Sequence, residues 1–262
     1  MIFQSPAKVA FELFGLPIYF YGIILAIAIF VGIYGSYLVY KKFYDSVDAE
    51  KILEIAPFVI ILGILGARIY YCLLNFNHYF SDPIQILNIR EGGLSIHGMI
   101  IVGIISLFFF AKSKKISFLK LLDSFSCGVI LAQAIGRWGN FFNSEAYGSP
   151  TNYFLKLYIS PENRLPEFIN FEYFHPTFLY ESVLNLVVFF ILLYLFKKGI
   201  KKPGLIACAY LILYSFVRIF IEQIRIDSVM YVASVPVPQL VSFITMIFAI
   251  IFAFFIRTKN VD

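Results

Sequence analysis

Seven stretches of this sequence are long and apolar enough to cross a lipid bilayer, and they restrict the fold more than any other feature. A membrane-spanning helix needs about 20 predominantly apolar residues. Inside the hydrocarbon layer every backbone polar group needs an internal partner, so a spanning segment of this length is a helix. We expect such helices at residues 18–40, 54–75, 94–111, 118–137, 177–196, 204–222 and 238–256. The sequence therefore predicts an all-α polytopic membrane protein that forms one integral membrane domain over residues 1–262.

The composition excludes most soluble folds. The chain is 60% hydrophobic and only 14% charged, whereas an average soluble domain is about half apolar and a quarter charged. In a membrane protein, the net charge of +5 indicates how the chain is oriented in the membrane, and we expect no nucleic-acid partner. The N-terminus lacks a charged segment followed by a cleavable apolar core, so we expect no removable signal peptide. Three cysteines, Cys72, Cys127 and Cys208, lie in apolar stretches and are expected to be free thiols.

Basic residues are unevenly divided between alternate loops. Thirteen lie in one set, namely Lys41, Lys42, Lys51, Lys112, Lys114, Lys115, Lys120, Lys197, Lys198, Lys201, Lys202, Arg257 and Lys259. Five lie in the other set, namely Lys8, Arg90, Lys156, Arg164 and Arg225. Because Lys and Arg favour cytoplasmic loops, we expect the N-terminus outside the cell and the C-terminus in the cytoplasm. A loop region outside the membrane should then join the fourth and fifth helices.

With that orientation, the polar side chains within the spans collect toward the outer half of the membrane. They are Tyr21, Arg68, His97, Arg137, Asn140, His175, Glu181, Arg218 and Glu222. A transporter instead needs polar residues near the midplane and along a path from both sides. A lipid or small-solute transporter is therefore the second hypothesis. A non-catalytic scaffold is a third, and it would need no cluster of phosphate-binding residues.

The sixth span suggests what the cluster binds. Tyr214, Arg218, Glu222 and Arg225 follow the spacing of one helical face, and Arg218 can pair with Glu222. A guanidinium offers a planar set of donors that suits phosphate. An outward cavity with Arg68, Arg137 and Arg218 would thus hold a phospholipid headgroup. The alternative is that these arginines only pair with Glu145, Glu181 and Glu222, or extend to the membrane surface.

The segment "GRWGNFFNSEAYG", from Gly136 to Gly148, is unusually polar for a chain of this kind. We interpret it as the exit of the fourth span. Gly136 and Gly139 permit close approach of another chain segment, and the amides can bond to backbone that leaves helical geometry.

The same segment resembles the signature of the prolipoprotein diacylglyceryl transferase family, G-R-x-G-N-F-x-N-x-E-x-x-G, at every fixed position. Further blocks agree in order along the chain: Tyr21-Gly22, Gly66 to Arg68, Gly92 to Gly98, His175 to Glu181, and Tyr214 to Asp227. Two positions depart from the family pattern. Met99 follows Gly98 where the family commonly has glycine, and Pro238 precedes Gln239 where the family usually has glycine.

The resemblance implies an enzyme of the bacterial cytoplasmic membrane with its active site on the outer side. Such an enzyme transfers the diacylglyceryl group of phosphatidylglycerol to the lipobox cysteine of a preprolipoprotein and releases glycerol phosphate. The expected partners are phosphatidylglycerol, preprolipoprotein signal peptides and membrane lipid. We expect no cofactor.

The resemblance also implies roles for particular residues. It places Arg137 and Arg218 at the phosphodiester, where cations stabilise the leaving group. Tyr21 and Tyr214 would orient the headgroup and Asn140 would bind glycerol hydroxyls. Arg68 and Glu222 complete the expected headgroup site. The supporting residues are Asn143, Glu145, Gly148 and Glu181.

The thiol of the acceptor must lose its proton, because the thiolate is the nucleophile. His97 is the candidate base, since histidine titrates in the right range and this one lies in a family block. A hydroxide held by an arginine, or deprotonation assisted by the lipid, stays open. We assign structural roles to His78 and His175 and predict no metal site, because the histidines and cysteines are scattered.

Overall fold

The computed structural model describes residues 1–88, 92–200, 202–227 and 231–258 of the chain. Three basic residues used above to orient the protein, Arg90, Lys201 and Lys259, lie outside the described residues.

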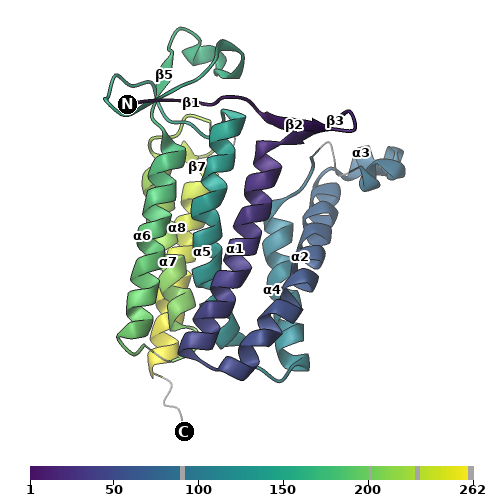
Figure 1. Ribbon diagram of the computed structural model, residues 1–262, viewed down its shortest axis with the longest axis vertical. Coiled ribbons are helices and arrows are strands. Elements are labelled where there is room, and N and C mark those ends of the chain that lie inside the picture. Colours follow the sequence, from purple (N-terminus) through teal and green to yellow (C-terminus); the bar gives the residue numbers. More distant parts are fainter. Residues whose placement is uncertain (89–91, 201, 228–230, 259–262) are drawn as a thin grey trace. The chain divides into compact units, whose positions relative to one another are not determined.

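Seven helices in the described part of the chain are long and apolar enough to cross a membrane (Figure 1). They are α1 (Phe20–Phe43), α2 (Ser46–Leu74), α4 (Ile96–Ser113), α5 (Phe118–Asn143), α6 (Thr177–Lys197), α7 (Leu205–Glu222) and α8 (Val237–Thr258). Two short helical segments, α3 (Phe76–Ser81) and η1 (Pro83–Leu87), follow α2. The prediction of an all-α polytopic membrane protein is confirmed.

Most helix boundaries lie within three residues of the predicted spans, and two differ by more, for physical reasons. Helix α2 begins well before residue 54, because the Asp45 side chain caps it by accepting bonds from the backbone N–H groups of Val47 and Asp48 at 2.7 and 3.1 Å. The first turns of α2 contain charged residues, so a prediction based on apolar runs did not include them. Helix α5 continues past residue 137 to Asn143, so the polar motif begins on a helix and not on chain that leaves one.

The chain divides into two compact units, each of which is described by itself. The first unit contains Met1–Ser36 and Leu122–Asp262, and the second contains Tyr37–Leu121. Helices α1 and α5 contribute residues to both. The prediction of one domain over the whole chain stays a prediction.

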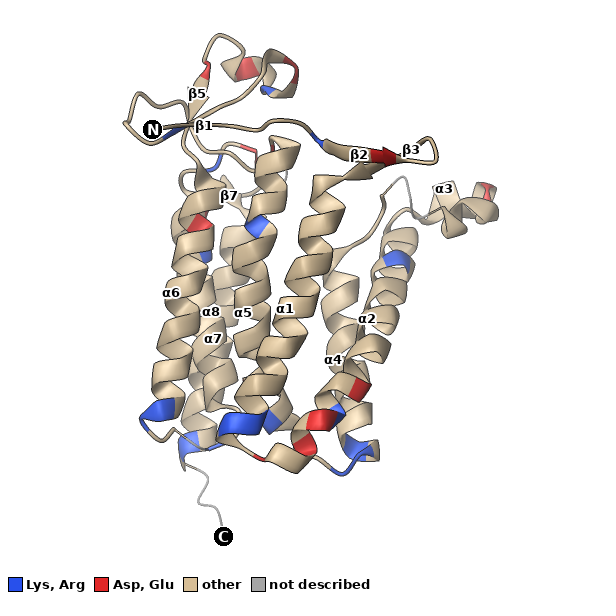
Figure 2. Ribbon diagram, viewed as in Figure 1, with Lys and Arg blue, Asp and Glu red and all other residues tan. Residues whose placement is uncertain are grey.

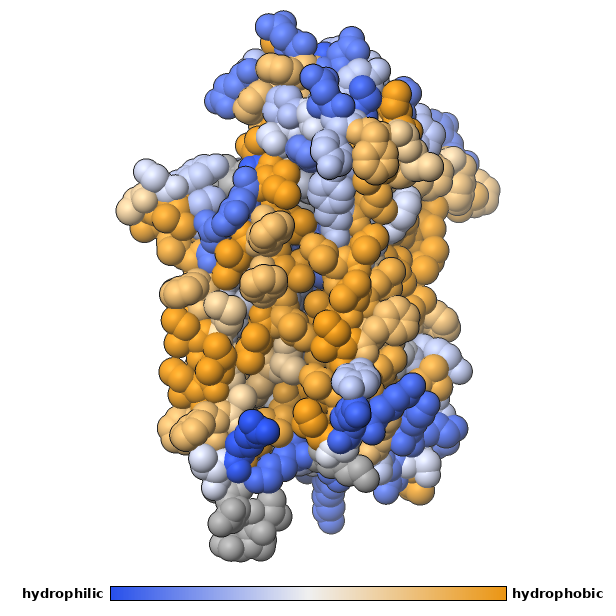
Figure 3. Space-filling model, turned by 90° about the vertical axis from the view of Figure 1, so that its left-hand side faces the viewer, coloured by the Kyte–Doolittle hydropathy of each residue, from blue (hydrophilic) through white to orange (hydrophobic). Residues whose placement is uncertain are grey.

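Surface chemistry follows the length of the helices. Lys, Arg, Asp and Glu gather at helix ends, with few along the shafts (Figure 2). Hydrophobic side chains cover the helices on the face drawn in Figure 3, and hydrophilic ones occupy their ends. A surface of this kind matches a hydrocarbon layer bounded by water on both sides.

Small residues let helices of the first unit approach closely. A side chain on Gly128 of α5 would overlap the Ser36 hydroxyl and the Gly32 carbonyl of α1. Close contact of this sort takes the place of the hydrophobic effect, which is weak between helices in lipid. Helices α6 and α7 pack together, as do α7 and α8.

Asp123 is an acidic residue within the span predicted at residues 118–137, and the structure gives it a capping role. Its buried carboxylate accepts hydrogen bonds from the backbone N–H groups of Gly204 and Ala207 at 2.8 and 2.7 Å. It therefore caps the N-terminus of α7 from a neighbouring helix, where both the free N–H groups and the helix dipole favour an anion.

The loop between α5 and α6 folds with the N-terminus into a small sheet that the sequence did not predict. Its strand order is β1 (Ile2–Gln4), β4 (Lys156–Tyr158) and β5 (Tyr173–Phe174), with β1 parallel to β4 and β4 antiparallel to β5. Two further 3-10 turns, η2 (Pro161–Asn163) and η3 (Pro166–Phe168), lie between β4 and β5. Leu157 and Phe174 of the sheet pack on Phe141 of α5 and Phe178 of α6. We call the end of the first unit that carries this sheet the head end (Figure 1).

Two hairpins complete the first unit. One is formed by β2 (Val9–Leu13) and β3 (Leu16–Tyr19), which leads directly into α1. The other is formed by β6 (Tyr231–Val232) and β7 (Val235–Pro236), which leads into α8.

The second unit is built on the contact of α2 with α4. A side chain on Gly98 of α4 would overlap the Gly66 carbonyl and Tyr70 Cβ of α2. The backbone N–H of Ser95 donates to the Ala67 carbonyl at 3.0 Å, which ties the start of α4 to α2. Gly66 of the "GAR" block and Gly98 of the "GGLSIHG" block are therefore required where these two helices meet.

Candidate functional site

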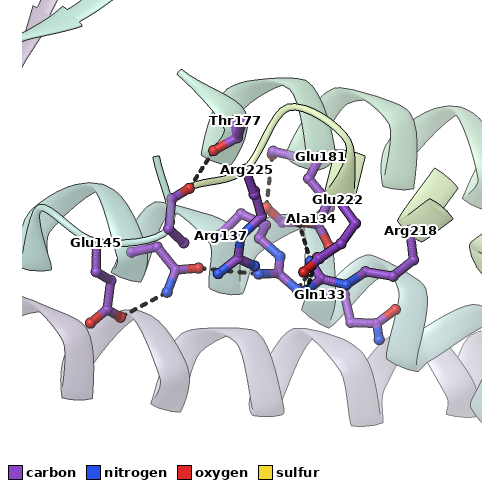
Figure 4. A network of polar contacts seen from close by, with 12 residues as sticks. Gln133, Ala134, Arg137, Glu145, Thr177, Glu181, Arg218, Glu222 and Arg225 are labelled. Carbon is purple, nitrogen blue, oxygen red and sulfur yellow. Dashed lines mark hydrogen bonds and ion pairs between the residues drawn. The ribbon is translucent and has the colours of Figure 1, made fainter. Parts of the chain in front are cut away.

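Four charged residues from α5, α6 and α7 form a chain of ion pairs near the head end (Figure 4). Arg137 Nη2 lies 2.8 Å from Glu181 Oε1, and Arg218 Nη1 lies 3.6 Å from Glu181 Oε2. Arg218 Nη2 lies 2.6 Å from Glu222 Oε2. Glu181 thus stands between two arginines, and the structure brings together Arg137, Glu181, Arg218 and Glu222 as predicted for one site. We call these four residues the arginine–glutamate cluster.

The carboxylates of the cluster are more deeply buried than the guanidinium groups. Side-chain exposure is 2% for Glu181 and 1% for Glu222, but 21% for Arg137 and 13% for Arg218. A buried charge in a membrane protein needs a partner. The glutamates are therefore placed to fix the positions of the arginines, whose other sides can meet a ligand.

Neither arginine has all five of its N–H donors engaged by the described residues. Arg137 also donates to Asn140 Oδ1 at 3.4 Å and to the hydroxyl of Tyr214. Arg218 Nη1 is buried without a hydrogen-bond partner in the described part of the chain. Both guanidinium groups are held by carboxylates and stay partly exposed, and a guanidinium in this state is suited to bind a phosphodiester.

Asn140 and Tyr21 lie next to the cluster. Asn140 Nδ2 donates to Glu145 Oε1 at 2.8 Å, so this amide links Arg137 to the exposed Glu145. The ring of Tyr21, at the start of α1, packs against Gly139, where an added side chain would approach its Cδ2 to 2.8 Å. Glycine at this position of the motif therefore makes room for a tyrosine that was predicted to belong to the site.

Asn143 lies at the edge of a groove of about 680 Å³ in the first unit. The groove is lined mainly by apolar groups, and its lining includes Tyr19, Tyr21 and Ala26. It runs between the β2–β3 hairpin and the first turns of α1.

Tyr214 lies one helical turn before Arg218 on α7. Its ring stacks on that of Tyr210, with centroids 5.8 Å apart, and the Tyr210 hydroxyl donates to Gln133 Oε1 at 3.3 Å. Gln133 in turn lies one turn before Arg137 on α5. A polar strip thus continues from the cluster along α5 and α7. Gln133 and Tyr210 were not predicted from the sequence as part of the site.

Helix α7 ends at Glu222, but the backbone N–H of Arg225 still donates to the Ile221 carbonyl at 3.2 Å, four residues back, and the charges of Glu222 and Glu181 act on the Arg225 guanidinium. That Arg225 lines the same face as Arg218 stays a prediction. Arg225 forms two hydrogen bonds with Asp227, at 2.8 and 2.9 Å, and Asp227 also accepts the backbone N–H of Ala146 at 3.1 Å. Burial lowers the pKa of Arg225, but the bonds and charge of Asp227 outweigh this effect and raise it. This pair joins the chain after α7 to the end of the motif.

Gly148 is the last residue of the motif and lies in a tight junction. An added side chain would come within 2.8 Å of His175 Cβ and 2.9 Å of Ile224 Cγ2. The backbone N–H of Gly148 donates to the His175 carbonyl at 3.0 Å, and His175 Nδ1 lies 3.2 Å from the Tyr180 hydroxyl. Burial lowers the pKa of His175. Gly148 and His175 therefore hold the entry to α6, which carries Glu181.

Asn185 was not identified from the sequence, although it lies one turn beyond Glu181 on the same face of α6. It is fully buried, and neither atom of its amide has a hydrogen-bond partner among the residues described. The spacing of four from Glu181 was the signal that could have found it.

Arg68 belongs to the second unit and has a different environment. It is 7% exposed, and its guanidinium lies 5.1 Å from the centroid of the Tyr79 ring. All five of its N–H donors are directed at backbone carbonyls, at 2.6–3.0 Å, in η1 and on either side of residues 89–91: those of Gln85, Ile86, Asn88, Gly92 and Gly93. Gly93 has a positive φ of 75°, and a side chain there would overlap the guanidinium. Arg68 thus joins α2 to η1 and to the two glycines before α4.

His97 is an exposed residue in the first turn of α4, with its ring centroid 6.2 Å from that of Tyr70. It also belongs to the second unit. That His97 and Arg68 join the residues of the first unit in one site stays a prediction.

Among the described residues, no set of three or more His, Cys, Asp or Glu side chains is placed to hold a metal ion. Cys72, Cys127 and Cys208 are buried free thiols.

The sequence model for prolipoprotein diacylglyceryl transferase matches residues 8–255. The chain belongs to this family. Several relatives carry the name phosphatidylglycerol–prolipoprotein diacylglyceryl transferase. One from Prochlorococcus marinus (strain MIT 9301) is 44% identical over 242 residues, which cover 86% of this chain and 81% of the relative. One from Thermosynechococcus vestitus is 40% identical over 245 residues, covering 93% and 90%. One from Synechococcus elongatus is 40% identical over 254 residues, covering 95% and 87%. As a member of the prolipoprotein diacylglyceryl transferase family, the chain is a membrane-embedded transferase.

Proposed function

We propose that this transferase moves the diacylglyceryl group of phosphatidylglycerol to the thiol of the lipobox cysteine of preprolipoproteins, the first step of bacterial lipoprotein maturation. Family membership and the names of the relatives support the reaction. The observation that carries it is the arginine–glutamate cluster, in which Arg137 and Arg218 share Glu181 and both stay partly exposed, so that a phosphodiester can reach them.

The chemistry that the cluster must promote is displacement at a glycerol carbon. The cysteine thiolate forms a carbon–sulfur bond, the carbon–oxygen bond to phosphate breaks, and glycerol phosphate leaves with the electron pair. Negative charge therefore grows on the bridging phosphate oxygen. Two fixed guanidinium groups stabilise this charge more in the transition state than in the ground state, which is the requirement for rate acceleration.

The neighbouring polar groups position the donor lipid. Tyr21 and Tyr214 orient the headgroup, and Asn140 bonds to glycerol hydroxyls. Glu222 fixes Arg218, and Asn143, Glu145 and Gly148 support the segment after α5. Arg68 acts differently from the prediction of direct headgroup binding: its donors are occupied by backbone, so we assign it the role of holding the segment that leads to His97.

For thiol activation, His97 is our candidate base, with a hydroxide held by an arginine and lipid-assisted deprotonation as the other routes. The site faces the outer side of the bacterial cytoplasmic membrane, with the N-terminus outside. The lipobox cysteine reaches this side because preprolipoproteins are exported through that membrane.

The test is transfer of labelled diacylglyceryl from phosphatidylglycerol to a lipobox peptide by the purified protein. We expect Arg137→Ala and Arg218→Ala to insert normally but to lose at least about 100-fold in rate, the usual effect of removing one donor to a developing oxyanion. Lysine should rescue poorly because it lacks the planar donor set. Arg257→Ala, which removes an arginine from the last turn of α8, is the control and should retain activity. Normal transfer by Arg137→Ala would exclude this residue from the site.

A separate variant tests the base. His97→Gln should bind phosphatidylglycerol almost normally and transfer about 10²–10⁴ times more slowly, which is the typical contribution of a positioned base. Raising the pH toward 8.5 should partly restore the rate, because more of the peptide thiol ionises unaided. Weak lipid binding with a residual rate that does not change with pH would contradict the assignment.

A further inference from the structure

The turn of the β2–β3 hairpin contains a residue that is unusual in two ways: its backbone conformation is rare for a bulky residue, and its apolar side chain is exposed. Leu13 pairs with Leu16, so the connection is the two residues Phe14 and Gly15, with φ of 51° and 75°. Two-residue turns with both φ values positive favour Asn-Gly, and a bulky residue at the first position is an outlier. The Phe14 side chain is also 97% exposed. Phe14 contradicts the residue preference of this turn type, and its exposure shows that packing within the protein does not compensate. Such a residue indicates a contact with something outside the protein.

The apolar tip continues along one face of the hairpin. In an antiparallel pair, residues opposite one another lie on the same face, and alternate residues share that face. Phe11 pairs with Ile18 and Leu13 with Leu16, so these four apolar side chains form one face, whereas Glu12 points to the other. Phe11, Leu13 and Leu16 are 52%, 50% and 50% exposed. Exposed apolar residues in a contiguous group mark an interaction surface.

The position of the hairpin identifies what covers this face. Strand β3 ends at Tyr19 and α1 begins at Phe20, whose backbone N–H donates to the Lys8 carbonyl at 3.0 Å. Helix α1 has 24 residues and is therefore about 36 Å long, against a hydrocarbon core of about 30 Å. The start of α1 thus lies within about one turn of the hydrocarbon edge, and the hairpin runs across that end of the helix (Figure 1). Tyr19, which is 49% exposed, is of the residue type favoured at this boundary.

We propose that the β2–β3 hairpin is an interfacial membrane anchor. Phe11, Leu13, Phe14 and Leu16 enter the boundary between headgroups and acyl chains, and Glu12 faces water. Amphipathic segments bind this region in proportion to their buried apolar area. The occupant of the face is therefore lipid, continuous with the lipid that surrounds α1.

The anchor has a consequence for the neighbouring groove. Ile18 and Tyr19 form one wall of the groove that Tyr21 and Asn143 also line. A hairpin fixed in the lipid surface sets the depth of this wall relative to the membrane. The proposal concerns the hairpin alone and does not depend on the reaction assigned to the protein.

Fluorescence of a single tryptophan tests the anchor in the full chain. The native Trp138 is the only tryptophan, so Trp138→Phe gives a background in which Phe14→Trp reports on the tip. The protein is reconstituted in phosphatidylcholine–phosphatidylglycerol vesicles with or without brominated acyl chains. We expect a blue-shifted emission from position 14, loss of intensity with brominated lipid, and weak quenching by aqueous iodide.

The matched control is Glu12→Trp in the same background, because it lies on the opposite face two residues away. It should be quenched by iodide and little by brominated lipid. Water-like emission from position 14 would overturn the proposal. A blue shift without bromine quenching would also overturn it, since a second protein copy or a peptide would then cover the tip. Equal bromine quenching at both positions would contradict the assignment of faces.

Discussion

Glu181 is the residue on which the geometry of the arginine–glutamate cluster depends. Its two carboxylate oxygens face different arginines from different helices, at 2.8 and 3.6 Å. Two guanidinium groups that share one buried anion are held at a fixed separation, as two contacts to one phosphodiester require. Without the anion they would repel each other in a region of low dielectric.

We therefore expect Glu181→Gln to lower both stability and activity. The change keeps the shape but leaves Arg137 and Arg218 without a common counter-charge, and breaking a buried pair costs several kcal/mol. Because both arginines are partly exposed, solvent screening reduces this to about 2 kcal/mol. Thermal unfolding in detergent measures the loss. The control is Glu167→Gln in the exposed turn η3, which should have the melting temperature of the parent protein. Equal melting temperatures for all three proteins would show that Glu181 does not stabilise the fold.

Individual residues of the site were predictable to different degrees. Arg137, Arg218 and Glu222 were found because charge within an apolar run is expensive and indicates function. Arg68 met the same criterion, yet all of its N–H donors bond to backbone carbonyls. No sequence pattern predicts which carbonyls will surround a guanidinium. Asp227 was not predicted as the partner of Arg225, because the bond forms only after α7 ends.

At the scale of elements, glycines decide which helices can meet. Gly98 of α4 faces Gly66 of α2 with no space for a side chain, whereas Gly103 on the same helix has no atom within 4 Å of the position of an added Cβ. Substitution of Gly98 therefore tests the need for close helix packing, whereas substitution of Gly103 tests helix propensity alone.

Gly98→Ala and Gly103→Ala form a matched pair of variants. Gly98→Ala forces α2 and α4 apart and should cost at least about 1–3 kcal/mol, the usual cost of overpacking. Gly103→Ala only adds helix propensity and should be neutral or stabilising by up to about 1 kcal/mol. Melting temperatures of the purified proteins and protease resistance of the segment before α4 give the comparison. Equal stability of the two variants would mean that α2 and α4 do not touch at Gly98.

The helices themselves were predictable, because a long apolar run in lipid has almost no alternative to a helix. The small strands were not. Strands of two to five residues show too little alternation, and β1 pairs with β4, whose residues lie far away in the sequence. The extension of α5 to Asn143 was also missed, because polar residues at the end of a span look like an exit from the helix.

For the molecule as a whole, the seven apolar helices make the two ends of the chain face opposite sides if each helix crosses once. Which end is outside depends on charge alone. Thirteen basic residues lie in the loops assigned to the cytoplasm and five in those assigned to the outside. Moving positive charge across the membrane is disfavoured, so we expect the larger group to stay in the cytoplasm. We then expect the loop between α5 and α6, and with it the head end, to lie outside.

Single cysteines labelled in intact cells test this orientation. The native thiols Cys72, Cys127 and Cys208 are first replaced, which is tolerable in principle because all are free. Glu162→Cys, in the turn η2, should react with a membrane-impermeant maleimide added outside. Lys198→Cys, at the end of α6, should react only after the cells are opened, because the four lysines at the end of α6 and just after it favour a cytoplasmic location. Labelling of Lys198→Cys in intact cells, with Glu162→Cys protected, would reverse the predicted orientation and place the arginine–glutamate cluster toward the cytoplasmic side, which would contradict the proposed outward-facing site.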